Sequence, residues 1–127
     1  MKTRYTIALS LLAGTVLGAA AIQGLHAQAK PKAYVVIEID VTNQDAFAKE
    51  YIPIVGKIIT DNGGKYLSRG GKITAIEGTA PKRLTILEFE NTEKAQAAFA
   101  SPAYREARKT GEKYAKFRVI AAEATTP

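Results

Sequence analysis

Two glutamates offer the chemistry of a proton donor or acceptor. Glu38 and Glu88 each interrupt an otherwise apolar run, in VVIEIDV and LTILEFE. If both faced one partly closed apolar cavity, desolvation and mutual repulsion would raise the pKa of at least one of them towards neutrality. The alternative is that each pairs with an Arg or Lys, or lies in water at the rim of a sheet. The two glutamates are the candidate catalytic residues, and both interpretations stay open.

The candidates for binding a ligand are Arg69, Glu77, Tyr104 and Arg108. Arg69 and Glu77 flank a Gly-rich corner, where the planar guanidinium could hold a carboxylate or phosphate with help from backbone N–H groups. The alternative is a salt bridge of Arg69 that fixes the corner. Tyr104 and Arg108 lie one helical turn apart and are predicted to form a surface pair.

Tyrosine hydroxyls extend this set. Tyr51, Tyr66 and Tyr104 could line a pocket and present their hydroxyls to a small organic ligand. Tyr51 also belongs to the apolar stripe of a predicted helix, so we interpret it as a core residue.

Several side chains that enzymes use for nucleophilic and metal chemistry are missing. The sequence has no Cys, and its only His, His26, lies in a segment that we expect to be removed. The remaining chain excludes Ser-His and Cys-His catalysis, His-ligated haem, and zinc sites built on Cys or His. We therefore expect no metal and no cofactor.

The first 29 residues have the pattern of a signal peptide. Lys2 and Arg4 give a positive start, residues 5–25 carry no charge, and Ala-Gln-Ala at 27–29 suits signal peptidase. An uncleaved anchor is the alternative, because the run is about as long as the roughly 20 residues that span a bilayer. We expect cleavage, a periplasmic or secreted protein without a membrane anchor, and a single domain over residues 30–127.

Charge argues against a nucleic-acid partner. Cleavage leaves 98 residues with a net charge of about +4, which is modest and dispersed. The basic residues between Arg105 and Arg118 are interleaved with acids, and we interpret them as the solvated face of a helix.

The order of predicted elements indicates how these residues are positioned. Alternation predicts strands at 33–41, 82–90 and 117–122. Thr42 is predicted to cap a helix that Pro53 kinks or breaks and that Asn62-Gly63 ends. Residues 63–78 are predicted as one strand bent at the Gly70-Gly71 pair or as two strands, at 65–69 and 72–77. One short helix follows to Phe99, and another begins at Ser101-Pro102.

This order fits an α+β fold, the ferredoxin-like split βαβ, with two main helices on one face of an antiparallel sheet. The other sheet face would carry Tyr34, Val36, Ile86 and Ile120. Such a face is too apolar to be left in water, so we expect a second copy of the chain to cover it as a homodimer.

The stretches AYVVIEIDVTNQDAFAKEY, GGKYLSRGGKITAIEG, APKRLTILEFEN and SPAYREAR together resemble the domain of unknown function 1330 family. That family belongs to the dimeric α/β-barrel superfamily, and the leader resembles its exported bacterial branch. The resemblance covers residues 33–122. It implies a ferredoxin-like protomer whose sheet pairs with its twin around a barrel-like cavity, and it implies no particular reaction.

Two classes of function stay open. The first is an exported dimeric α/β-barrel protein that binds a small organic ligand or has an accessory role. The alternative is a cofactor-free monooxygenase or isomerase, chemistries found in the wider superfamily, using the acids and tyrosines of the cavity. The sequence does not decide whether the protein is an enzyme.

Overall fold

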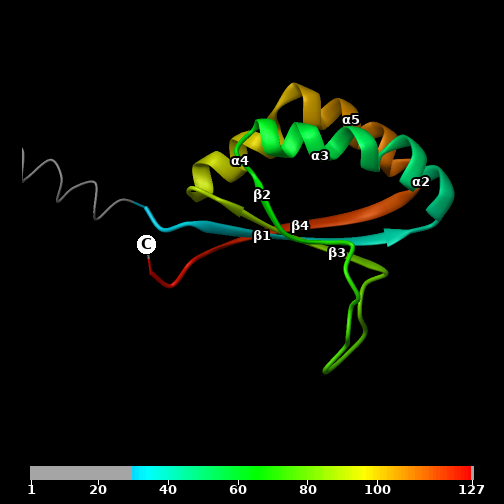
Figure 1. Ribbon diagram of the computed structural model, residues 1–127, viewed down its shortest axis with the longest axis horizontal. Helices are drawn as coiled ribbons and strands as arrows, with labels where there is room; N and C mark the ends of the chain where they lie inside the picture. The colour runs from blue at the N-terminus through cyan, green and yellow to red at the C-terminus, as the bar shows by residue number, and fades with distance from the viewer. Residues whose placement is uncertain (1–29, 127) are drawn as a thin grey trace, which may run out of the picture. The chain divides into compact units, whose positions relative to one another are not determined.

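A computed structural model shows, among the residues that it describes, four antiparallel strands in one sheet and four helices on one of its faces (Figure 1). It describes residues 30–126, so the predicted signal peptide and Pro127 lie outside the described residues. Pro31–Thr126 form one compact unit.

The sheet has the strand order β2-β3-β1-β4. β1 (Ala33–Val41) lies between β3 (Arg83–Phe89) and β4 (Ala115–Glu123), and β2 (Lys65–Arg69) pairs with the outer side of β3. Alternate residues of β1 are buried because successive side chains of a strand point to opposite faces. This arrangement confirms the predicted ferredoxin-like α+β fold.

The helices are α2 (Gln44–Glu50), α3 (Ile52–Asp61), α4 (Thr92–Ala100) and α5 (Pro102–Glu112). The predicted break is confirmed, because α2 and α3 are separate helices and Pro53 lies in the first turn of α3. The predicted cap at Thr42 is wrong. Asn43 caps α2 through its side-chain oxygen, which accepts from the Ala46 N–H at 3.2 Å, and the Thr42 hydroxyl donates instead to the Tyr114 carbonyl at 2.9 Å.

The other helix ends agree with the sequence signals. α3 ends before Gly63, whose φ of +90° is the left-handed conformation that glycine adopts easily. The Ser101 hydroxyl accepts from the Tyr104 N–H at 3.3 Å and Pro102 opens α5, so the predicted Ser-Pro start is confirmed.

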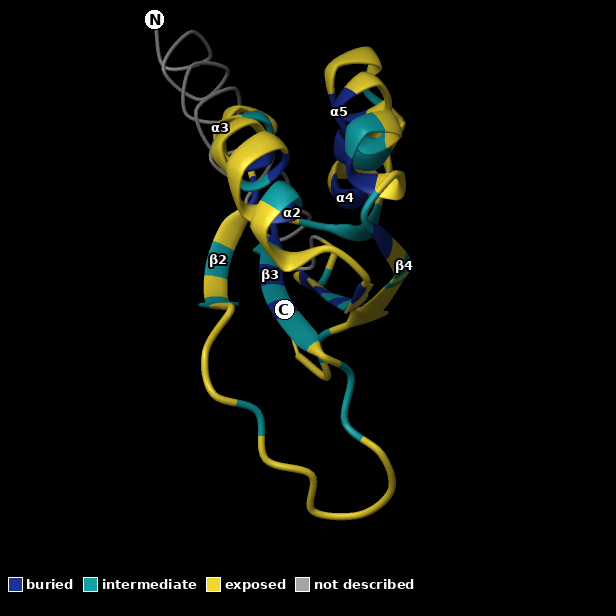
Figure 2. Cartoon of the chain, turned by 90° about the vertical axis from the view of Figure 1, so that its right-hand side faces the viewer, coloured by how far each residue is buried: buried dark blue, intermediate teal, exposed yellow. Residues whose placement is uncertain are grey.

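The predicted strand at 72–77 is wrong. The chain from Gly70 to Lys82 contains no strand, and it projects from the sheet on the side away from the helices (Figure 1). The ladder between β2 and β3 ends at the Arg69–Thr85 pair, so this run has no neighbouring strand to bond to. Most of this β2–β3 loop is exposed, and Ile76 is 93% exposed (Figure 2).

The face of the sheet without helices carries an apolar row. Ile86, Val36 and Ile120 are in register across three strands, and Tyr34 is the next residue of β1 on this face. Tyr34 is 37% exposed and Ile120 is 43% exposed. The predicted apolar outer face is therefore present.

Candidate ligand-binding crevice

The two candidate catalytic glutamates lie on neighbouring strands and on the outer face of the sheet, as predicted. Glu38 is paired with Leu84, whereas Glu88 is paired with Tyr34, so the two acids are offset by four residues along the strands. At about 3.3 Å per residue this offset is roughly 13 Å. The structure does not bring the two carboxylates together, and their catalytic role stays a prediction.

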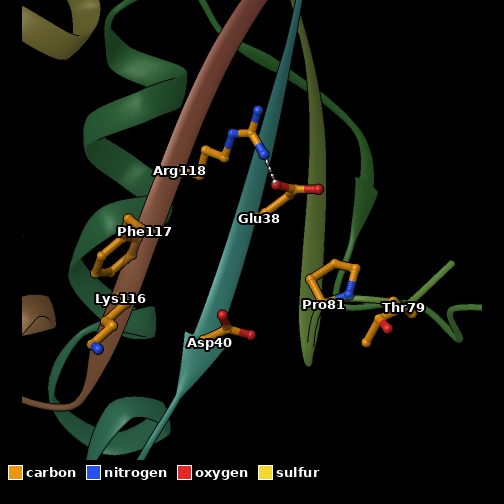
Figure 3. Close-up of a pocket in the computed structure, with 8 residues that line it drawn as sticks. Glu38, Asp40, Thr79, Pro81, Lys116, Phe117 and Arg118 are labelled. Atoms are coloured by element: carbon orange, nitrogen blue, oxygen red, sulfur yellow. Dashed lines mark hydrogen bonds and ion pairs between the residues drawn. The ribbon is translucent and has the colours of Figure 1, made fainter.

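Each of these acids has a basic partner. Glu38 Oε2 lies 3.5 Å from Arg118 Nη1 (Figure 3), and Glu88 Oε1 lies 3.5 Å from Lys32 Nζ. Glu38 also borders a hollow of about 400 Å³ that includes Asp40, Lys116 and residues of the β2–β3 loop. Acids and bases are balanced in this hollow, which matches the alternative interpretation of Glu38 as an ion-pair partner.

A second cavity lies between the helices and the sheet, and it brings together one predicted arginine and all three predicted tyrosines. We call it the crevice. It is lined by Tyr51, Tyr66, Arg69, Arg83 and Tyr104 together with Ile37, Ile39, Ile52, Val55, Ile59 and Thr85. Its free volume is about 20 Å³, which is room for about one water molecule.

A β-bulge in β2 places Arg69 in the crevice. Tyr66 pairs with Leu87, but Ser68, two residues on, pairs with Ile86, so Leu67 is an extra residue in the ladder. Because a strand alternates between two faces, one extra residue returns Arg69 to the same face as Tyr66. The guanidinium carbon of Arg69 lies 4.5 Å from the centre of the Tyr66 ring.

Arg69 is held by neutral groups. Its Nη2 donates to the Ile52 carbonyl at 3.1 Å, and a methyl group on Gly56 of α3 would lie only 2.6 Å from Nη2. The salt bridge considered for Arg69 is absent from the described part of the chain. Glu77, the other predicted residue of the corner, lies exposed in the β2–β3 loop.

Arg83 is the residue that the sequence analysis missed. It faces the helices at the start of β3, and within residues 30–126 neither Arg83 nor Arg69 forms an ion pair. Its buried Nε has no hydrogen-bond partner among the described residues, and a methyl group on Gly70 would lie 2.7 Å from its Nη1. Burial and, after it, the charge of Arg69 lower the pKa of Arg83. The alternation of β3 could have identified it, because Arg83 occupies an inward position in phase with Thr85, Leu87 and Phe89.

Two tyrosines of the crevice, Tyr51 and Tyr66, are hydrogen-bond donors at neutral pH. Tyr51 is 3% exposed, which agrees with its interpretation as a core residue. Burial, followed by the nearby Tyr104 phenol, raises the pKa of Tyr51. Burial also raises the pKa of Tyr66 although the Arg69 charge opposes the shift. Both phenols therefore keep their protons.

The prediction that Tyr104 and Arg108 form a surface pair is wrong for Tyr104, which is 4% exposed. α5 presents it to the core because it shares an apolar face with Ala107 and Gly111. Arg108 Nη1 does donate to the Tyr104 hydroxyl, at 3.4 Å. Arg108 also lies over the Phe117 ring at 4.1 Å. Its Nε makes no hydrogen bond of good geometry but lies 3.3 Å from Glu112 Oε1.

The described residues offer no obvious metal site. No three His, Cys, Asp or Glu side chains between residues 30 and 126 gather closely enough to hold an ion. Across the same residues, no helix has the length and apolar character needed to cross a bilayer.

The order of strands and helices defines a ferredoxin-like α+β fold. The sequence model of a domain of unknown function, DUF1330, matches residues 32–125. The chain therefore belongs to the DUF1330 family. No curated protein matches the sequence.

Solved structures agree with this fold. RPA0582 from Rhodopseudomonas palustris, of unknown function, is 18% identical with a TM-score of 0.62, over 78% of this chain and 86% of that chain. A dimeric ferredoxin-like protein of unknown function from Thermobifida fusca is 10% identical with a TM-score of 0.57, over 75% and 92%. SnoaB, a cofactor-independent oxygenase from Streptomyces nogalater, is 10% identical with a TM-score of 0.52, over 76% and 96%. At these identities the likeness concerns the fold alone.

Proposed function

We propose that this protein binds a small organic acid in the crevice between its helices and its sheet. The observation that carries the proposal is the pair Arg69 and Arg83, which share one cavity and have no acidic partner among the described residues. Two neighbouring cations repel each other, and a partly buried guanidinium loses hydration. A carboxylate would relieve both costs, because a guanidinium can donate one hydrogen bond to each of its two oxygens.

The other crevice residues suit the same ligand. Protonated Tyr51 and Tyr66 can donate hydrogen bonds to an oxygen, and the walls made by Ile37, Val55 and Ile59 suit an apolar body.

Binding without turnover fits this crevice better than acid-base catalysis. A general base must accept a proton near the working pH. The ionisable groups of the crevice are guanidiniums and phenols, and the pKa values of Tyr51 and Tyr66 are raised rather than lowered. Glu38 and Glu88 lie on the opposite face of the sheet, away from this cavity.

We further infer that the protein is an exported homodimer. The signal-peptide pattern of residues 1–29 supports export. The apolar outer face supports pairing through the sheet, and one solved structure of similar fold is described as dimeric. Mass spectrometry of the protein from its own host tests export, because cleavage after Ala29 leaves Lys30 as the first residue.

Calorimetric titration with matched acids and amides tests the ligand class. We expect acetate, hexanoate or benzoate to bind more tightly than acetamide, hexanamide or benzamide, because only the acids are charged. Arg83→Gln should weaken acid binding about 10- to 100-fold, and Arg105→Gln, on the exposed surface of α5, should not change it. If no acid binds more tightly than its amide, the proposal fails.

A further inference from the structure

Arg69 and Arg83 have different surroundings, although they line one cavity. Arg83 is partly buried, with its guanidinium against the backbone of Gly70. Arg69 is the only exposed residue among the described residues that line the crevice. Its guanidinium is held by one hydrogen bond to Ile52 and by the face of Tyr66. Solvent therefore reaches Arg69 more easily than Arg83, and Arg69 is the lining side chain with room to move outwards.

The size of the crevice requires such a movement. About 20 Å³ cannot hold an organic acid. Most of the other lining residues are core side chains, such as Ile59 at 1% and Ile39 at 4% exposure, and they are fixed by close packing. Space for a ligand can open where Arg69 lies.

The place that the Arg69 guanidinium occupies would fit another flat group. Its planar guanidinium lies on Tyr66 at 4.5 Å, a separation at which aromatic rings also stack. It also lies close to α3 at Gly56, whose lack of a side chain leaves room for the guanidinium. When Arg69 leaves, a slot remains between the Tyr66 ring and the helix backbone.

We propose that the ligand is an aromatic carboxylate whose ring replaces the Arg69 guanidinium on Tyr66 while its carboxylate binds Arg83. This inference rests on the proposed function and assigns the two arginines separate roles. Arg83 is the anchor that fixes the anion, and Arg69 is the gate that covers the slot in the empty protein. Gly56 leaves room for the closed gate.

Matched ligands test the aromatic slot. Benzoate and cyclohexanecarboxylate carry the same charge on six-membered rings, and only benzoate is flat and aromatic. We expect benzoate to bind roughly 2- to 10-fold more tightly, and Tyr66→Leu should remove that preference. Equal affinities in the unmutated protein would overturn the aromatic slot and leave the binding of organic acids standing.

Stopped-flow kinetics test the gate. The chain has no Trp, so tyrosine emission and its energy transfer to salicylate report binding. Arg69→Ala should raise the association rate several-fold, because it uncovers the slot. Gly56→Ala should instead weaken salicylate, because its methyl group would occupy the slot. Arg83→Gln should also weaken salicylate, about 10- to 100-fold.

The two arginine variants also separate the gate from a second anchor. If Arg69→Ala weakens salicylate as much as Arg83→Gln, Arg69 is an anchor and the gate is wrong, while the anion site stands. If Gly56→Ala does not fold, Arg69→Ala alone decides between these outcomes. If no acid in the titrations binds more tightly than its amide, the proposed function itself fails.

Discussion

At the scale of single residues, Arg83 has the surroundings of a binding residue more than of a structural one. A side chain that stabilises a fold has its polar atoms satisfied. The Nε of Arg83 is buried without a partner, and the nearby Arg69 charge adds to the burial that lowers its pKa. Such unfavourable placement is common where a ligand will later supply the missing partner.

Removing this charge should therefore stabilise the empty protein. We expect Arg83→Met to raise the free energy of unfolding by about 0.5–2 kcal/mol, because the apolar chain keeps the volume and removes the repulsion with Arg69. Urea unfolding without ligand measures the effect. Arg105→Met, at an exposed position, should stay within about 0.5 kcal/mol. A loss of stability in Arg83→Met would show that the guanidinium is structural.

Tyr51 should make stability fall at alkaline pH. Burial raises its pKa above the usual value of 10.0, so the unfolded chain loses this proton at a lower pH than the folded chain. The favourable contribution is complete below about pH 10 and declines above it, by at most about 1.4 kcal/mol per pH unit. Urea unfolding at pH 9, 10 and 11 should give a smaller decline in Tyr51→Phe. An unchanged decline in Tyr51→Phe would mean that another group controls alkaline stability.

At the scale of elements, the two glycines after β2 differ in what they require. Gly70 has φ of +66°, and a side chain there would collide with Arg83. Gly71 does not have a positive φ, and a methyl group there would meet only Ser68 Oγ, at 3.7 Å.

Gly70→Val should consequently destabilise the fold by about 1–3 kcal/mol, whereas Gly71→Val should be close to neutral. Thermal melts of the two variants compare adjacent glycines in the same turn. Equal effects would contradict the assignment of the strained position to Gly70.

Elements that depend on local signals could be predicted from the sequence. The alternation of β1 and the Ser-Pro start of α5 are encoded within a few neighbouring residues, and the structure contains both. The bulge at Leu67 could not be predicted, because it depends on how β2 aligns with β3. That alignment places Arg69 on the same face as Tyr66, so the crevice could be predicted only in part from the sequence. The run at 72–77 has strand-forming residues but no partner strand, and pairing overrides propensity.

At the scale of the whole molecule, the apolar row on the outer face predicts the assembly. Val36 lies at its centre, between Ile86 and Ile120. Val36→Glu would bury an unpaired charge in a sheet-to-sheet interface, and we expect it to weaken the dimer at least about 100-fold. Sedimentation at micromolar concentration measures this, with Ala97→Glu on the exposed face of α4 as the control. A monomeric unmutated protein would contradict pairing through the sheet.

The β2–β3 loop is an expected site of proteolytic cleavage. Trypsin cleaves after lysine, and Lys72 and Lys82 are both exposed in this segment. If a second copy covers the outer face, it also shields the loop that projects from that side (Figure 1). Cleavage there should slow as the protein concentration rises, since dilution separates the copies. The time course of a simple digestion would then report the dissociation constant of the dimer without any label.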